Sequence, residues 1–83
     1  MKSDWLNELS QILVDIKNRE EMTLFLKGLL TESELEEIAT RIQIVKKLKA
    51  GISQHTIARE MGVGVSTVTR GSKELQKGRF IQI

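Results

Sequence analysis

The polar side chains best suited to recognising a ligand gather in one short run, Gly-Val-Ser-Thr-Val-Thr-Arg-Gly at residues 64–71. Its hydroxyl and guanidinium groups can bond phosphate oxygens and base edges, and its Val and Thr methyl groups can contact the thymine methyl. The chain has no Cys and one His. Thiolate metal sites and His-rich catalytic constellations are therefore excluded. With no nucleophile–base pair and no phosphate-binding loop, the sequence favours binding over catalysis, and we expect no enzyme and no metal.

The stretch that positions this run, residues 53–75, has the spacing of a helix-turn-helix. Gly62 suits a tight turn because glycine reaches positive φ without a Cβ clash. Val63 would fill the angle between the two helices. Ala58 would be small because the second helix crosses close to it, and Val68 follows ten residues later. A generic helical hairpin is the alternative.

Caps and apolar positions define the two helices of this unit. Ser53 is suited to cap the first helix, and Gly64 or Ser66 the second. The expected inward residues are Ile57, Ala58 and Met61 on the first helix, and Val68 and Leu75 on the second.

The second helix also has weak points. Its residues 65–69 are weak helix formers, and Gly71 inside it costs about 1 kcal/mol relative to Ala. We hypothesise that DNA, or a ligand near Gly71, orders this helix. The alternative is that Gly71 only permits close helix packing.

In a helix-turn-helix, the second helix enters the major groove with its N-terminal residues at the base edges. The start of the first helix commonly meets phosphate. Basic residues further along both helices could add phosphate contacts, Lys77 among them. The expected contacts to double-stranded DNA are Gln54, His55, Arg59, Val65, Ser66, Thr67, Thr69 and Lys73. An ordinary solvated polar surface is the alternative.

The charge distribution agrees with this interpretation. Residues 1–40 carry four basic and nine acidic side chains, a net −5, and residues 41–83 carry nine and two, a net +7; together they give the +2 of the chain. Part of the split belongs to one helix, with acids near its start and lysines near its end, as the helix dipole favours. A basic half most often faces nucleic acid, although a solvated basic surface stays possible.

Three further helices are expected before the helix-turn-helix. Ser3 is suited to cap the first. Asn18 with Glu21 resembles a capping box that begins the second, and Thr31 with Glu34 is a clear capping box that opens a long third helix. Gly51 would end the third helix. Its expected buried face is Leu35, Ile38, Ile42, Val45 and Leu48.

The 83 residues indicate one small domain, 1–83. A chain of this length buries about 60–65% of its unfolded surface and often leans on a partner subunit. The first two helices are rich in apolar residues, so residues 1–50 are expected to form a dimer interface; a monomeric core is the alternative. Neither a membrane span nor a signal peptide is apparent, and we expect a soluble protein of the cytoplasm.

Several segments resemble the bacterial tryptophan operon repressor family over about residues 29–75. These are Leu30-Thr31, Thr40-Arg41-Ile42, Gly51 followed by Ser53-Gln54, and the whole run 62–72. The resemblance implies an all-α, intertwined homodimer that binds a palindromic operator as a transcriptional repressor. Residues 78–83 are too few for the C-terminal helix of the enteric repressors. We expect an extended tail, as in a shorter repressor-like subgroup.

The resemblance also implies L-tryptophan as a corepressor, with no other cofactor. It places Arg41 and Arg70 on either side of the indole, Thr31 near the carboxylate and Gly71 beside the ring. Glu74 stands where the family has a serine near the amino group. Independently, two guanidinium groups suit a carboxylate and an aromatic face, although two surface arginines are the alternative. A ligand-independent regulator and a protein-interaction module also stay open.

Overall fold

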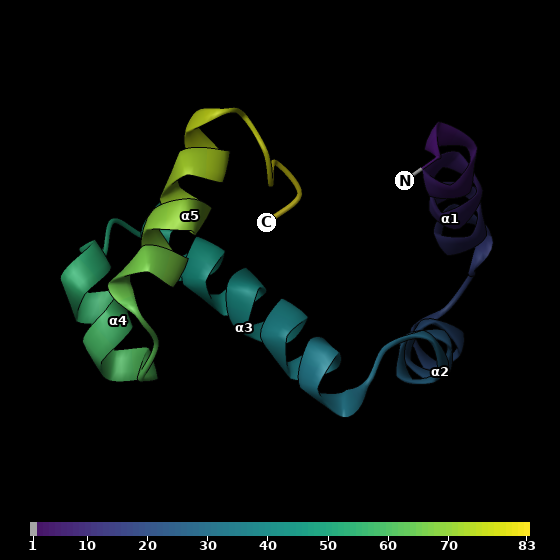
Figure 1. Cartoon of the computed structure of the whole chain (residues 1–83), viewed down its shortest axis with the longest axis horizontal. Helices are drawn as coiled ribbons and strands as arrows, with labels where there is room; N and C mark the ends of the chain where they lie inside the picture. The colour runs from purple at the N-terminus through teal and green to yellow at the C-terminus, as the bar shows by residue number, and fades with distance from the viewer. Residues whose placement is uncertain (1) are drawn as a thin grey trace. The chain divides into compact units, whose positions relative to one another are not determined.

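A computed structural model describes residues 2–83, and its regular elements in that range are five α-helices and no strand. They are α1 (Ser3–Asp15), α2 (Arg19–Leu29), α3 (Glu32–Lys49), α4 (Gln54–Met61) and α5 (Val65–Gln76), labelled in Figure 1. The expected all-α class is confirmed. Within residues 2–83, no helix has the length and apolar character needed to cross a membrane. The chain divides into two compact units, one up to Leu35 and one from Glu36 to Ile83.

In the first unit, α1 begins differently from the prediction. Lys2 occupies the N-cap position with an extended backbone, and no side chain caps the helix. The amide of Trp5 already donates to the Lys2 carbonyl at 3.1 Å. Ser3 is therefore the first helical residue, and the cap predicted for it is wrong.

The other two caps of this unit are confirmed. Asn18 Oδ1 accepts from the Glu21 amide at 2.9 Å. At the start of α3, the Glu34 amide donates to Thr31 Oγ1 at 3.1 Å, and the Thr31 amide donates to Glu34 Oε1 at 2.9 Å. The two bonds form a complete capping box. The bond from the Thr31 amide, followed by that with the Thr31 side chain, lowers the pKa of Glu34 below its ordinary value.

The side chains of α1 and α2 form no core of their own. Among the described residues of these two helices none is buried. Apolar side chains such as Trp5 and Leu24 are exposed, Leu24 by 72%. This unit by itself therefore does not bury its apolar side chains.

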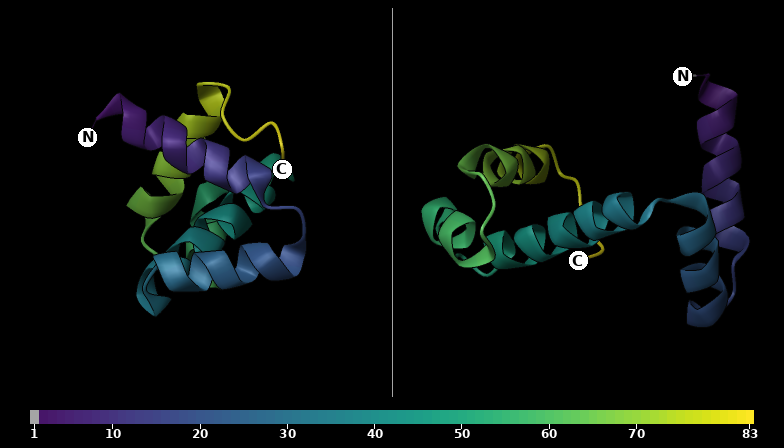
Figure 2. Two further views of the ribbon diagram at one scale, coloured as in Figure 1. Left: turned by 90° about the vertical axis from the view of Figure 1, so that its right-hand side faces the viewer. Right: turned by 60° about the horizontal axis from the view of Figure 1, so that its bottom comes forward.

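The core of the second unit lies where α4 and α5 pack on the C-terminal part of α3 (Figure 2). Ile44, Ile57, Ala58 and Val68 are buried there. The turn between α4 and α5 is the predicted one, with Gly62 at φ +67° and the Val63 amide donating to the Ala58 carbonyl at 3.0 Å. Around this core pack the partly buried Leu48, Ile52, Met61 and Val63. Leu75, expected to be buried, is half-buried.

The buried face predicted for α3 is partly wrong. Ile38 and Ile42 are 39% and 41% exposed, whereas Val45 is buried as predicted and Ile44, which was not predicted, is buried as well. The cause is the place where α5 crosses α3: a Cβ on Gly71 would meet the side chain of Ile44 at 3.4 Å. Ile38 and Ile42 precede this crossing along α3, so the core of the second unit does not cover them.

The expected extended tail is also wrong. After α5 the chain turns at Gly78, whose φ is +88°, and folds back (Figure 1). Lys49 Nζ, at the end of α3, donates to the carbonyl oxygens of Phe80 and of Ile83, the latter at 2.7 Å. An ammonium group with three protons can satisfy two carbonyls at once, and it holds this short segment beside the end of α3.

Candidate nucleic-acid interface

The first turn of α5 is exposed and polar. Gly64 is its N-cap residue, as one of the two predicted alternatives, and no side chain caps the helix. Val65, Ser66 and Thr67 are exposed, while Val68 one position later is fully buried against α4. The buried Val68 fixes which side of α5 faces the protein, so the hydroxyl groups of Ser66 and Thr67 face solvent.

The start of α4 supplies the second part of the surface. Ser53 Oγ accepts from the Thr56 amide at 3.3 Å, which confirms the predicted cap. His55 is exposed, and Gln54 is half-buried. The Thr69 hydroxyl donates to Gln54 Oε1 at 2.7 Å and so joins α5 to α4.

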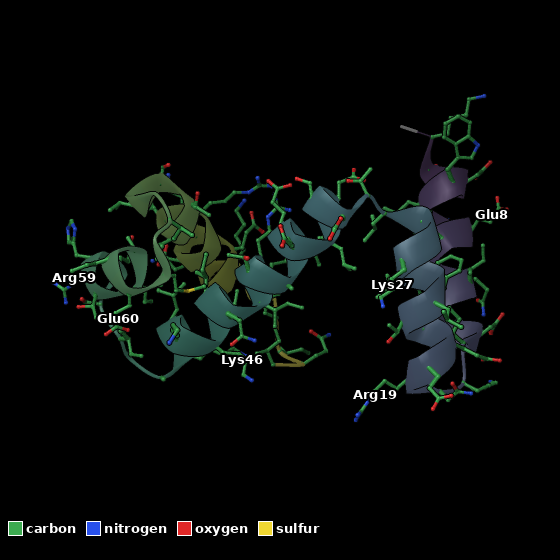
Figure 3. The ribbon with its side chains drawn as sticks, turned by 90° about the horizontal axis from the view of Figure 1, so that it is seen from below. Glu8, Arg19, Lys27, Lys46, Arg59 and Glu60 are labelled. Carbon is green, nitrogen blue, oxygen red and sulfur yellow. The ribbon has the colours of Figure 1, made fainter. Side chains whose placement is uncertain are left out.

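Each of these two helices carries a basic side chain in its last turn. Arg59 is exposed and points away from α4 in Figure 3, next to Glu60. Lys73 is exposed on α5. Exposed guanidinium and ammonium groups on flexible side chains can adjust their positions to contact the phosphates of a DNA backbone.

The residues expected to hold a ligand are divided between the two units. Thr31 belongs to the first unit and is engaged in the capping box. Arg41, Arg70, Gly71 and Glu74 belong to the second. The Arg41 side chain is half-exposed, and its Nη2 lies 3.8 Å from Glu37 Oε1. Within residues 2–83, Arg70 makes no salt bridge and its side chain is exposed.

Glu74, the departure from the family pattern, has partners in its own segment. Its carboxylate pairs with Lys77 at 3.2 Å and with Arg79 at 3.3 Å. The hydrogen bond from Lys77, then the charges of both bases and the bond from Arg79, outweigh desolvation and lower the pKa of Glu74.

Two polar contacts were missed by the sequence analysis, Gln54 with Thr69 and Lys49 with the tail. Gln54 and Thr69 are 15 residues apart. Lys49 is 31 residues from Phe80 and 34 from Ile83. One weak signal existed for the first: Gln54 and Thr69 were both assigned to the same surface, on neighbouring helices.

A helix-turn-helix with an exposed polar second helix is the structure of a DNA-binding transcription regulator. The family model described as "Trp repressor protein" matches residues 4–79. A protein named "Trp operon repressor homolog" in Vibrio cholerae serotype O1 is 36% identical over 75 residues, which cover 89% of this chain and 72% of the relative. Similarly named proteins are 38% identical in Vibrio parahaemolyticus, over 88% and 71% of the two chains, and 36% in Xylella fastidiosa strain M23, over 82% and 75%.

The chain therefore belongs to the Trp repressor family. It is a DNA-binding transcription regulator of the Trp-repressor type, and its family consists of regulators, not enzymes.

Proposed function

We propose that this regulator binds a palindromic operator with α5 in the major groove. The observation that carries the proposal is the two-sided nature of α5, with Val68 fully buried and the neighbouring Ser66 and Thr67 exposed. A helix held in this way presents a fixed polar edge to a groove. The residues proposed to contact DNA are Gln54, His55, Arg59, Val65, Ser66, Thr67, Thr69 and Lys73. The proposed location of the protein is the cytoplasm.

The proposed active form is a homodimer joined through residues 1–50. Exposed apolar side chains on α1, on α2 and on the part of α3 that precedes its crossing with α5 support it, among them Leu24, Ile38 and Ile42. A second copy of the chain would remove this surface from water at about 25 cal/mol per Å². Two copies would present two α5 helices to half-sites about 34 Å apart.

The experiment for DNA binding is selection from random and palindromic duplex libraries, followed by affinity measurement on the enriched site. Wild-type protein should enrich a two-fold site, and Thr67→Ala should weaken binding to it. Gln76→Ala, exposed at the end of α5, is the control and should bind as wild type does. Absence of any enriched sequence with folded wild-type protein would favour the protein-interaction module.

We further propose that the second unit takes an aromatic amino acid, L-tryptophan, as corepressor. Arg41 and Arg70 would offer guanidinium groups to its ring and carboxylate, with Gly71 beside the ring. Glu74 now pairs with Lys77 and Arg79. It would give up one of these two partners to bind the ammonium group of the ligand. The role that the resemblance gives Thr31 rests on the resemblance alone.

Calorimetry of the purified protein with L-tryptophan tests the corepressor. Wild-type protein should release heat, and Arg70→Ala should abolish it. Arg19→Ala, an exposed arginine of α2 (Figure 3), is the control. The engaged state of Glu74 favours one rival, a ligand-independent regulator of the same fold. That rival is established if wild-type protein gives no heat and still binds its operator.

A further inference from the structure

The hydrogen bond between Thr69 and Gln54 joins two members of the proposed DNA surface to each other. Thr69 Oγ1 donates and Gln54 Oε1 accepts, over 2.7 Å, in a half-buried position between α5 and α4. Gln54 is the first residue of α4, and Thr69 lies one turn into α5. The bond therefore ties the start of one helix to the reading edge of the other.

This bond fixes what each group can still do. A hydroxyl has one proton, and once that proton is donated the oxygen can only accept. Phosphate oxygens also only accept, so the engaged Thr69 hydroxyl has nothing to offer them. In the Gln54 amide, Oε1 accepts the bond from Thr69, and Nε2 keeps two N–H donors. These donors suit a phosphate oxygen.

We propose that Gln54 and Thr69 form a polarised pair in which Gln54 donates to a phosphate and Thr69 accepts from the amino group of a base. The inference rests on the DNA-binding function proposed above and adds a base preference to it. In the major groove adenine presents its N6 amino group and cytosine its N4 amino group, whereas guanine and thymine present acceptors. On the strand that Thr69 faces, the pair selects adenine or cytosine at one position of each half-site.

The neighbouring hydroxyls have a different role. Within residues 2–83, the side chains of Ser66 and Thr67 make no hydrogen bond. Their protons are free for phosphate oxygens. The surface thus divides into hydroxyls that donate, at Ser66 and Thr67, and one that accepts, at Thr69.

The test compares the sites that variants select from the palindromic library. Thr69→Val keeps the shape but removes the hydroxyl, and it should lose the preference for adenine or cytosine at one position per half-site. Gln54→Met removes the acceptor and frees the Thr69 proton, so guanine or thymine should become acceptable at that same position. Gln76→Met changes an exposed residue at the end of α5, outside both proposed interfaces, and should select the wild-type site.

A base analogue provides a second measurement that needs only wild-type protein and Thr69→Val. Replacing the preferred base by its analogue without the amino group, purine for adenine or 2-pyrimidinone for cytosine, should weaken wild-type binding about three- to tenfold, as for one neutral hydrogen bond. It should leave the affinity of Thr69→Val unchanged. This measurement decides the question if Gln54→Met does not fold.

Three results would overturn the inference. Thr69→Val selecting the wild-type site shows that Thr69 reads no base. Gln54→Met, folded and with the wild-type preference, shows that the pair is not polarised. In both cases DNA binding stands. If wild-type protein enriches no duplex at all, the proposed function itself fails, and the inference fails with it.

Discussion

At the scale of single residues, two glutamates, Glu34 and Glu74, are held by local partners. Glu34 is fixed by the Thr31 amide, and Glu74 by Lys77 and Arg79. Both glutamates have a lowered pKa for this reason. Each contact joins residues at most five positions apart, so the charge state of these groups follows from local chain geometry.

The capping box predicts an acid-sensitive start of α3. The pKa of Glu34 is lowered from 4.5 in the folded chain. Its contribution to the free energy of unfolding is therefore full above that value, and is lost as the pH falls through the lowered one. Glu34→Gln keeps an acceptor but does not titrate. Its unfolding midpoint should change less than that of wild type between about pH 6 and pH 3, measured by circular dichroism. Glu36→Gln changes an exposed residue of the same helix and should keep the acid dependence of wild type. If the unfolding midpoints of wild type and of Glu34→Gln change equally with pH, the prediction is wrong.

Gly71 gives a second prediction at this scale. A Cβ there would lie 3.4 Å from Ile44 Cγ2 and 3.5 Å from Leu48 Cδ1, ordinary contact distances. Gly71→Ala should therefore raise the free energy of unfolding by up to about 1 kcal/mol through helix propensity, measured in urea. Gly28→Ala, where a Cβ would meet nothing within 4 Å, is the matched control. A loss of stability at Gly71 alone would show that helix packing requires the glycine.

At the scale of elements, the segment after α5 is a structural part of the second unit. Lys49→Met removes the donor to Phe80 and Ile83. Amide exchange of residues 79–83 should become faster, while the buried Val68 keeps its protection. Lys46→Met, another exposed lysine of α3, should leave the tail unchanged. Equal exchange in the tails of Lys49→Met and wild type would contradict the role of Lys49.

Sequence predicted the helix boundaries well because caps are local. Asn18, Thr31, Ser53 and Gly62 each act within a few residues of their own position. The exception is Ser3, where one extra residue joined the helix and moved the cap position to Lys2.

Contacts between distant segments could not be predicted in this way. Which side of α3 is buried depends on where α5 crosses it, and periodicity along α3 does not contain that information. The Gln54–Thr69 bond and the Lys49 anchor likewise need the folded chain. The candidate site residues were placed by motif and resemblance, and their roles stay predictions until binding is measured.

At the scale of the whole molecule, the uncovered apolar side chains predict a dimer that a single charge can disrupt. Leu24 is 72% exposed on α2. If a second copy covers this surface, Leu24→Glu should convert the dimer into monomer, because it would bury an unpaired carboxylate. Thr23→Glu, its exposed neighbour, adds the same charge without removing an apolar side chain. Analytical ultracentrifugation measures both masses, and a dimeric Leu24→Glu protein would exclude this face as the interface.

The charge of the second unit predicts steep salt dependence. Each neutralised phosphate adds about −0.9 to the slope of log affinity against log salt. Arg59→Gln should therefore make the slope less steep by about 1 per protomer. Glu60→Gln, its outward-pointing neighbour in Figure 3, should not. A slope that Arg59→Gln leaves unchanged would remove Arg59 from the interface.

The bare apolar sides of α1 and α2 have a consequence for how much of this regulator a cell must make. A chain whose first two helices have no buried residue among those described gains stability by mass action when copies associate. Its melting temperature should then rise with concentration, and dilute chains should be cleared by proteolysis sooner than abundant ones. If the proposed dimer forms, the dosage of this protein would set its lifetime as well as its occupancy of DNA.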